Sequence, residues 1–315
     1  MSNSAIAASG LRKTYGDKVV LDGIDLDVRA GTVFALLGPN GAGKTTTVNL
    51  LTTLAKADAG TARVAGHDVV TETKAVRAIV GVTGQFAAVD ELLTGRENLQ
   101  LMADLKRLGS SEGKRVVADL LERFDLTESA PKLVSTYSGG MRRKLDLAMT
   151  LVGNPRIIFL DEPTTGLDPR SRRTMWDIVR QLVADGVTIF LTTQYLDEAD
   201  QLADRIAVLD QGRLVAQGTP GELKRQIPGS HVRFRFAGDL ELDAAMRLLP
   251  DSTRDEEEDL TLRVPSDGGA KSVRDLLDQL DANSIEVEEF SVHTPDLDDV
   301  FLALTGRTSM KVNAQ

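Results

Sequence analysis

The stretch GPNGAGKT, residues 38–45, decides the fold of this chain. It fits the pattern G-x-x-x-x-G-K-[ST] and lies between the apolar run Val33 to Leu37 and a helical pattern from about Gly43 to Leu54, which is the context that the pattern requires. Glycines in such a turn let successive backbone N–H groups face a phosphate at the start of a helix. The alternatives are an ordinary glycine-rich turn, which the full eight-residue match disfavours, and a dinucleotide-binding turn, which lacks the Lys-Thr ending. The stretch therefore predicts a phosphate-binding loop in an α/β fold.

Two side chains of this loop carry its chemistry. Lys44 is expected to reach the terminal phosphates of a nucleotide, and the hydroxyl of Thr45 is expected to bind Mg²⁺. The predicted nucleotide-binding residues of this segment are Gly38, Pro39, Asn40, Gly41, Ala42, Gly43, Lys44, Thr45 and Thr46.

A second element, Ile157 to Glu162, reads as a buried apolar strand that ends in two carboxylates. Strand alternation sends neighbouring side chains in different directions. Asp161 is then placed to hold Mg²⁺, and Glu162 to act as general base toward the attacking water. A solvated strand end is the alternative for this pattern by itself, and the phosphate-binding loop makes that alternative weaker.

A third element is Ser138-Gly139-Gly140 at the start of a helical pattern. Ser138 is a good N-cap, and the N–H groups of the glycines form a second anion site at a helix start. Two separate phosphate-binding helix starts in one chain suggest that a nucleotide is sandwiched between two copies, each of which supplies one half of the site.

The order GPNGAGKT, VTGQ, YSGGM, FLDEP and TGLD resembles the ATP-binding-cassette (ABC) ATPase family across residues 5 to 225. The resemblance implies a P-loop nucleotide-binding domain with a helical subdomain, and ATP and Mg²⁺ as ligands. It implies that Tyr15 stacks on adenine and that Gln85 touches Mg²⁺ or water. It also implies that Ser138, Gly139 and Gly140 close on the γ-phosphate of the opposing copy, with Asp168 in the loop that crosses the dimer interface. For Tyr15 taken alone, packing on the core is the alternative.

The segments LLTGRENL, LTTQYLDEADQLADRIAVLDQGRLVAQGTPGELK and LDDVFLALTG extend the match to the daunorubicin-resistance type of bacterial drug exporter. That resemblance implies a homodimer attached to separate membrane permease subunits of an ABC-2-like exporter, at the cytoplasmic face of the cell membrane. It implies export of a hydrophobic drug, antibiotic or lipid, with Leu92 to Leu99 in the region that docks the membrane partner. The alternative is a soluble, non-transport ABC ATPase that acts as a mechanical switch.

Gln194 departs from the wider family pattern, in which histidine follows the strand end Thr192-Thr193. A glutamine amide can donate a hydrogen bond to phosphate but cannot become a cation or relay a proton. The drug-exporter branch favours glutamine at this position, so the resemblance implies a variant of the catalytic site. The nearby Asp197-Glu198-Ala199-Asp200 spells a helicase box, but its position in an amphipathic helical stretch predicts a solvated face.

Length, composition and net charge limit the classes of protein to which this chain can belong. The 315 residues predict two domains: residues 5–227, with a helical subdomain at about 88–150, and a small α+β domain at 230–306, divided near Gln226. The net charge of -10 argues against nucleic-acid binding, which needs a basic face. No apolar run approaches the roughly 20 residues of a membrane helix, so we expect no direct membrane span. Cysteine is absent, which excludes disulfides and thiolate metal sites.

Overall fold

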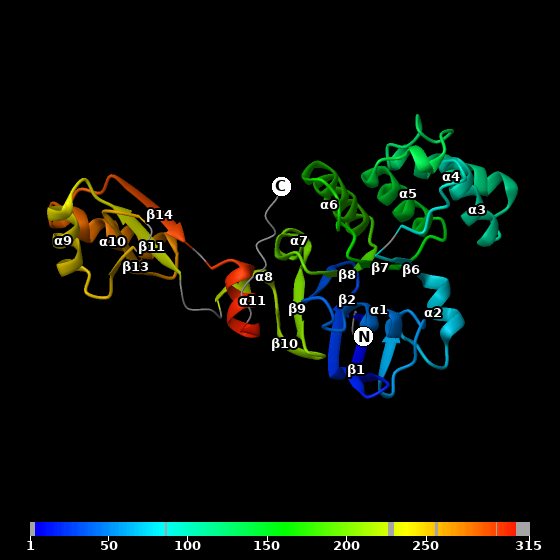
Figure 1. The fold of residues 1–315 in the computed structure, drawn as a ribbon, viewed down its shortest axis with the longest axis horizontal. Helices are drawn as coiled ribbons and strands as arrows, with labels where there is room; N and C mark the ends of the chain where they lie inside the picture. The colour runs from blue at the N-terminus through cyan, green and yellow to red at the C-terminus, as the bar shows by residue number, and fades with distance from the viewer. Residues whose placement is uncertain (1–3, 86, 226–229, 256–257, 294, 307–315) are drawn as a thin grey trace. The chain divides into compact units, whose positions relative to one another are not determined.

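The chain divides into two compact units, residues 1–220 and 221–315 (Figure 1). The computed structural model describes residues 4–85, 87–225, 230–255, 258–293 and 295–306. The domain boundary predicted near Gln226 falls on residues 226–229, which lie outside the described residues. Each unit is built on its own sheet structure, and each has its own hydrophobic core.

Two sheets form the frame of the first unit. The six-stranded sheet has the order β10-β9-β3-β8-β7-β6, parallel except for the antiparallel edge strand β10. The four-stranded sheet has the order β2-β1-β4-β5 and is antiparallel. The strands are β1 Ser4–Tyr15, β2 Lys18–Arg29, β3 Val33–Leu37, β4 Ala59–Val64, β5 His67–Asp68, β6 Val80–Thr83, β7 Ile157–Asp161, β8 Thr188–Thr193, β9 Arg205–Asp210 and β10 Arg213–Gly218.

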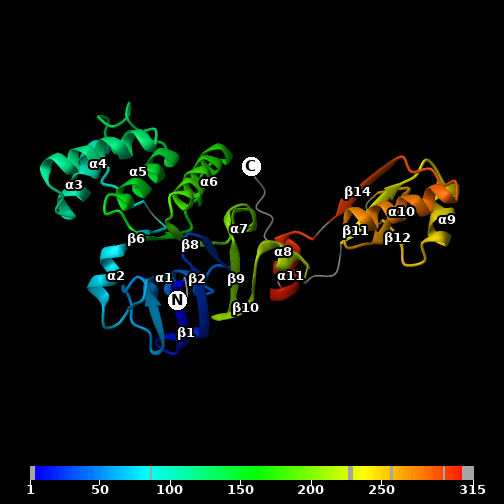
Figure 2. The same cartoon turned by 180° about the vertical axis from the view of Figure 1, so that it is seen from behind.

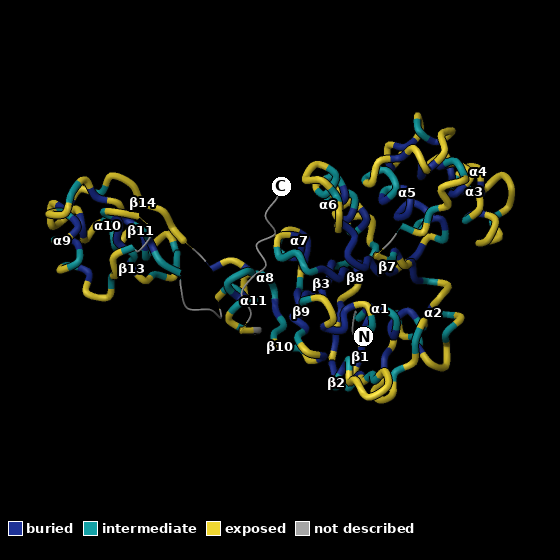
Figure 3. The backbone as a smooth tube through the Cα atoms, viewed as in Figure 1, coloured by how far each residue is buried: buried dark blue, intermediate teal, exposed yellow. Residues whose placement is uncertain are grey.

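Strands β3, β7 and β8 are buried at every position (Figure 3). Strands that are covered on both faces need no polar alternation, which is why their sequences are continuous apolar runs. The βαβ unit expected from the sequence is confirmed, because β7 and β8 are parallel neighbours joined by one helix. In the core of this sheet the ring of Phe190 stacks on Phe34 and packs against Phe159.

Helix α1, which follows the phosphate-binding loop, contacts strands of both sheets. Its buried residues Val48, Leu50 and Leu51 join the core that the two sheets share. Helices α6 and α7 cover the face of the six-stranded sheet opposite to α1 (Figure 1). The helices of this unit are α1 Lys44–Leu51, α2 Thr73–Ile79, α3 Gly95–Leu105, α4 Ser110–Arg123, α5 Gly139–Leu151, α6 Pro169–Ala184 and α7 Leu196–Leu202, with a 3-10 turn at Val134–Thr136 and α8 Pro220–Arg225 at the division between the units.

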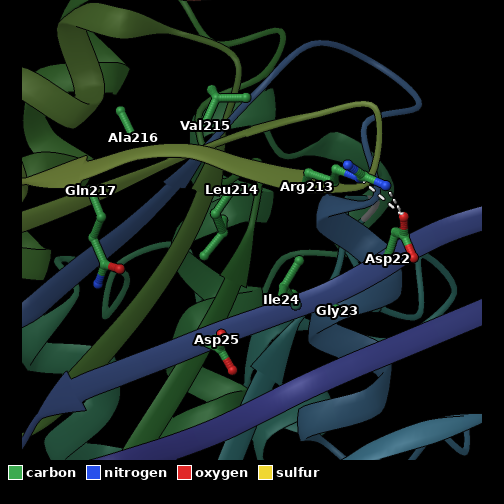
Figure 4. A pocket seen from close by; sticks show the side chains of 9 residues that line it. All are labelled: Asp22, Gly23, Ile24, Asp25, Arg213, Leu214, Val215, Ala216 and Gln217. Atoms are coloured by element: carbon green, nitrogen blue, oxygen red, sulfur yellow. Dashed lines mark hydrogen bonds and ion pairs between the residues drawn. The ribbon is translucent and has the colours of Figure 1, made fainter.

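Strands β2 and β10 are the edges of their two sheets, and they meet along one groove (Figure 4). The Asp22 backbone N–H donates to the Gly212 carbonyl at 2.9 Å, and the Arg213 guanidinium donates to the Asp22 carboxylate. We call the contact between these two side chains the Arg213–Asp22 clamp. Beyond the clamp the two strands diverge, and the side chains of Ile24 and Leu214 line the groove. The contact ties the antiparallel sheet to the parallel one beside the end of the phosphate-binding loop.

The second unit is a four-stranded antiparallel sheet with two helices packed on one face (Figure 2). Its order β12-β13-β11-β14 and the sequence β-α-β-β-α-β are those of a ferredoxin-like fold. The expected α+β arrangement is confirmed, with β12 as a short additional strand that the sequence did not predict. The elements are β11 His231–Arg235, α9 Asp239–Leu248, β12 Thr253–Arg254, β13 Thr261–Pro265, α10 Ala270–Ala282, β14 Glu289–His293 and α11 Leu297–Thr305.

Candidate active site

The phosphate-binding loop turns tightly between β3 and α1, and only glycine fits at two of its positions. Gly43 has φ 114°, and a Cβ there would lie 2.6 Å from Leu21 Cδ2. A Cβ on Gly38 would lie 2.3 Å from the Leu209 carbonyl oxygen. The pattern in the sequence therefore reflects close packing against neighbouring strands as well as the need for free N–H groups.

Lys44 is buried and points back into its own loop. Its Nζ donates to the Gly38 carbonyl at 2.8 Å and to the Pro39 carbonyl at 3.3 Å, and it lies 3.1 Å from Glu162 Oε1. The loop carbonyls thus hold the ammonium group in place, facing the carboxylate of Glu162, the residue that directly follows β7. An ammonium ion fixed in this way can bind phosphate oxygens as a point charge.

Asp161, the last residue of β7, lies between two hydroxyl groups. Thr45 Oγ1 donates to Asp161 Oδ2 at 2.8 Å, and Thr192 Oγ1 donates to Asp161 Oδ1. Thr192 comes from the neighbouring strand β8 and was not singled out from the sequence. Its parallel register with Asp161 places the hydroxyl there, and no local pattern reveals such pairing before the strand order is known.

Glu162 directly follows β7 and has φ 49°, in the left-handed region that non-glycine residues rarely adopt. The backbone turn, more than strand alternation, separates its side chain from that of Asp161. Its carboxylate accepts hydrogen bonds from Gln85 Nε2 and from Thr165 Oγ1, both at 3.4 Å. Unusual backbone conformations of this kind concentrate at functional sites.

Arg143, on the buried side of α5, holds the backbone around these residues. It donates to the carbonyls of Gly84 at 2.7 Å and Pro163 at 2.8 Å, and it approaches the Asp161 carbonyl at 3.3 Å. It also pairs with Asp146, which accepts from the Ala88 N–H. The guanidinium therefore fixes the segments that precede Gln85 and flank Glu162.

Burial dominates the electrostatics of this pair. Burial raises the pKa of Asp146 and lowers the pKa of Arg143, so desolvation outweighs their mutual attraction. We infer that the pair positions the backbone rather than stabilises the fold through its charge. The i,i+3 spacing of Arg143 and Asp146 was the signal in the sequence that could have identified them.

Gln194 follows β8 at the same edge of the sheet and is half-buried. Leu37 pairs with Thr193, and Asp161 pairs with Thr192, so Gly38, Glu162 and Gln194 come directly after three adjacent parallel strands. The carboxyl ends of parallel strands are where α/β sheets bind ligands.

The expectation of a solvated helix face at Asp197 to Asp200 is wrong for Glu198, which is fully buried. Trp176 Nε1 of α6 donates to Glu198 Oε1 at 3.3 Å, and burial raises the pKa of this carboxyl. The guanidinium of Arg172 lies 4.9 Å from the ring centroid of Tyr195. Both contacts attach the start of α7, next to Gln194, to α6.

The second anion site lies at the start of α5. Ser138 caps the helix as predicted, accepting from the Met141 N–H at 3.3 Å, and it is exposed together with Gly139. A Cβ on Gly140 would lie 2.6 Å from Ser171 Oγ. The exposed Asp168 caps α6 in the same way, and hydrogen bonds from the Ser171 hydroxyl and backbone lower its pKa.

The predicted site residues thus fall into two groups. One group lies at the carboxyl edge of the parallel sheet and consists of Lys44, Thr45, Gln85, Asp161, Glu162 and Gln194. The other group lies at the adjoining starts of α5 and α6 and consists of Ser138, Gly139, Gly140 and Asp168. Tyr15 ends β1, with its ring half-exposed and Lys13 Nζ 5.2 Å from its centroid, so it does not pack in the core.

Fold and site together define an ATP-binding-cassette ATPase. The ABC transporter family matches residues 21–165, and the family described as the DrrA1-3-like C-terminal domain matches residues 218–305. The chain belongs to the family of ABC transporter ATP-binding proteins to which the DrrA drug-resistance proteins belong.

Individual relatives agree with this assignment. The chain is 51% identical over 310 residues, covering 97% of both chains, to the daunorubicin resistance ATP-binding protein DrrA3 of Streptomyces coeruleorubidus. It is 39% identical, over 97% of its length and 95% of the relative's, to the Nod factor export ATP-binding protein I of Ralstonia nicotianae. A dimeric cassette in a post-hydrolysis state bound to ADP and Pi superimposes with a TM-score of 0.62 at 25% identity, covering 68% of this chain and 98% of that one.

The chain is therefore an ATPase subunit of the ABC type. Within the described residues, no helix combines the length and the apolar character that crossing a membrane requires.

Proposed function

We propose that this chain binds and hydrolyses ATP to power export of a hydrophobic drug, antibiotic or lipid through a separate membrane subunit, from the cytoplasmic face of the membrane. The observation that carries the ATPase chemistry is the convergence of Lys44, Thr45, Asp161 and Glu162 at one edge of the parallel sheet. The names of the relatives, daunorubicin resistance and Nod factor export, support the transport step.

Hydrolysis then depends mainly on position and charge. Lys44 binds the terminal phosphates, and the backbone N–H groups of the loop donate hydrogen bonds to the remaining phosphate oxygens. A phosphate that engages Lys44 replaces the contact of Lys44 with Glu162, so the carboxylate becomes available to the attacking water and can take its proton. Gln85, which donates to Glu162, orients that carboxylate.

The residues present fit Mg²⁺. Thr45 Oγ1 and Asp161 Oδ2 are hard oxygen donors 2.8 Å apart, of the kind that Mg²⁺ prefers. When bound, the ion would neutralise charge on the phosphates. A further ligand role for Gln85 remains part of the proposal, and its described contact is with Glu162.

A second copy completes the site in this proposal. Ser138 and Gly139 present a helix start to solvent, where its N–H groups can receive the γ-phosphate held by another copy. Asp168 lies beside them at the same surface, and Tyr15 exposes the ring that would stack on adenine. The dimeric form of the related cassette supports this arrangement.

Two leucines of the helical subdomain are candidates for the contact with the membrane subunit. Leu92 is 85% exposed and Leu133 is 48% exposed. The bridge between Thr94 and Leu133 and the hydrogen bond from Val134 N–H to the Leu93 carbonyl bring their segments side by side. Neighbouring exposed leucines give this surface apolar area of the kind that a protein partner can cover.

The proposal predicts that Leu92→Asp releases the chain from membranes that contain its permease, because a carboxylate placed in an apolar contact must be desolvated. ATP hydrolysis by the purified chain should not change. The measurement is the fraction that sediments with membranes when the chain is co-expressed with a candidate membrane permease. Leu240→Asp, at a leucine of the second unit that is 83% exposed, is the matched control.

Equal retention of both variants, with export intact, would contradict docking at this surface. A chain that never sediments with the membrane protein, and whose activity depends instead on a soluble partner, would favour the non-transport mechanical switch.

The position of Gln194 yields a separate prediction. If its amide donates to the charge that develops on the γ-phosphate, Gln194→Ala should reduce turnover by about 10²–10³-fold while ATP binding stays almost unchanged. Gln194→His should keep substantial activity, because imidazole offers a donor at similar reach. Turnover at saturating Mg-ATP measures both effects, and the exposed Gln201→Ala is the matched control. If the turnover of Gln194→Ala lies within about twofold of the wild-type value, Gln194 does not take part in catalysis.

A further inference from the structure

The edge strands of the described sheets differ in how they are protected against pairing with another chain. Strands β2 and β10 contain register shifts and are joined by the Arg213–Asp22 clamp. Strands β5, β6 and β12 have only two to four residues. Bulges, clamps and short length are the usual means by which proteins block a sheet edge.

Strand β14, Glu289–His293, is longer than β5, β6 and β12, and its last residue, His293, lies 3.9 Å from Asp299 of α11. Its pairing with β11 runs over five residues without a register shift, and its sequence EFSVH contains neither lysine nor proline. All five residues are exposed, and in both views the strand forms the outer side of the sheet (Figures 1 and 2). In the described part of the second unit, β14 pairs only with β11.

The two apolar residues of β14 lie on the side of the sheet that carries the core. Phe290 and Val292 pair with the buried Phe234 and Val232 of β11, yet they remain 48% and 40% exposed. The opposite face of β14 bears Glu289, which lies 2.8 Å from Arg235, and His293, whose ring lies 4.7 Å from that of His231. In the described part of this unit, the hydrophobic surface therefore continues to the edge strand, where Phe290 and Val292 stay partly exposed.

The sequence of β14 is complementary to itself in the antiparallel direction. With two copies centred on Ser291, Glu289 faces His293 of the other copy, and Phe290 faces Val292. A carboxylate then meets an imidazole that can donate to it, and an aromatic ring meets a β-branched side chain, both favourable cross-strand pairs. A shift by one residue would place Phe290 opposite Ser291 and turn the apolar face of one strand outward.

We propose that the second units of two copies of this chain pair through β14, which joins their sheets into one continuous antiparallel sheet of two-fold symmetry. An isologous contact of this kind places each residue of the strand against its complement on the other copy. The contact is separate from the nucleotide sandwich proposed above and does not depend on it.

The absence of cysteine from the chain gives a direct test. Ser291 lies on the expected two-fold axis, and directly opposed residues of antiparallel strands have Cα atoms about 4.5–5.5 Å apart, within the range of about 4.4–6.8 Å that a disulfide spans. Full-length Ser291→Cys, oxidised with copper–phenanthroline without nucleotide, should therefore form a disulfide-linked dimer rapidly. Gln279→Cys, exposed on α10, is the matched control and should link much more slowly.

The register of the proposed β14 pairing is tested with two further cysteine variants, which carry affinity tags of different lengths. Glu289→Cys and His293→Cys should each link poorly alone, because the two copies of either residue would lie about 14 Å apart along the strands, at about 3.4 Å per residue. Their mixture should give the mixed-tag dimer. Linking of Ser291→Cys no faster than Gln279→Cys would overturn the proposal, as would a mixture that fails to link. Because no nucleotide is present, failure of the ATP-dependent sandwich would leave these results unchanged.

Discussion

Glu162→Gln is expected to slow ATP turnover by about 10²–10⁴-fold, the range that a general base contributes, while ATP affinity stays close to that of the wild-type protein. The carboxylate acts on water and not on the bound nucleotide, and a glutamine amide can keep the contacts with Gln85 and Thr165. Removal of the negative charge also leaves Lys44 free for the phosphates. The ATP-bound dimer should therefore accumulate.

Size-exclusion chromatography with Mg-ATP measures this accumulation beside single-turnover hydrolysis. Glu112→Gln, which removes an exposed carboxylate from the first turn of α4, is the matched control and should hydrolyse ATP normally as a reversible dimer. A Glu162→Gln protein that binds ATP yet stays monomeric would contradict the nucleotide-sandwich dimer. A variant that hydrolyses ATP at the wild-type rate would show that Glu162 is not the general base.

Lys44→Ala is expected to abolish turnover and to weaken ATP binding by at least about 30-fold, because truncating one member of a buried, hydrogen-bonded charge pair costs about 2 kcal/mol or more. The structure adds a consequence for stability. Lys44 and Glu162 are both buried and lie 3.1 Å apart, so the variant leaves a buried carboxylate without its cation. Its melting temperature should fall although the chain remains folded.

The two effects of this variant can be separated. Lys44→Ala combined with Glu162→Gln removes both charges, so the melting temperature should recover while nucleotide binding does not. Lys56→Ala, at an exposed lysine just beyond α1, should change neither quantity. Nucleotide affinity of Lys44→Ala near the wild-type value would contradict the assignment of the loop.

The motifs were predictable from sequence because each one encodes a local requirement of the backbone. Gly38 and Gly43 have space only for a hydrogen, and Ser138 caps the helix that it precedes. The apolar runs at Val33–Leu37 and 157–160 became parallel strands, since strands covered on both faces are mostly apolar along their length. Such features depend on neighbours within a few positions and are visible in the order of residues.

Other features depend on which distant segments pack together. The DEAD stretch looks like a solvated helix face, but α7 packs under Trp176 of α6 and buries Glu198 completely. Arg143 reads as one of three consecutive cations, and only the folded chain brings the carbonyls of Gly84 and Pro163 to it. Burial and long-range hydrogen bonds follow from packing geometry, which a periodic pattern does not contain.

The sequence by itself determined the ATPase class, the phosphate-binding loop, the paired carboxylates and the α+β character of the second unit, because local motifs and periodicity specify these. The tertiary structure alone decided that Thr192 shares Asp161 with Thr45, that the backbone turns left-handed at Glu162, and that β14 is an edge strand in the described part of the second unit. Each of these depends on how segments far apart in the sequence pack together, which local patterns in the sequence do not contain.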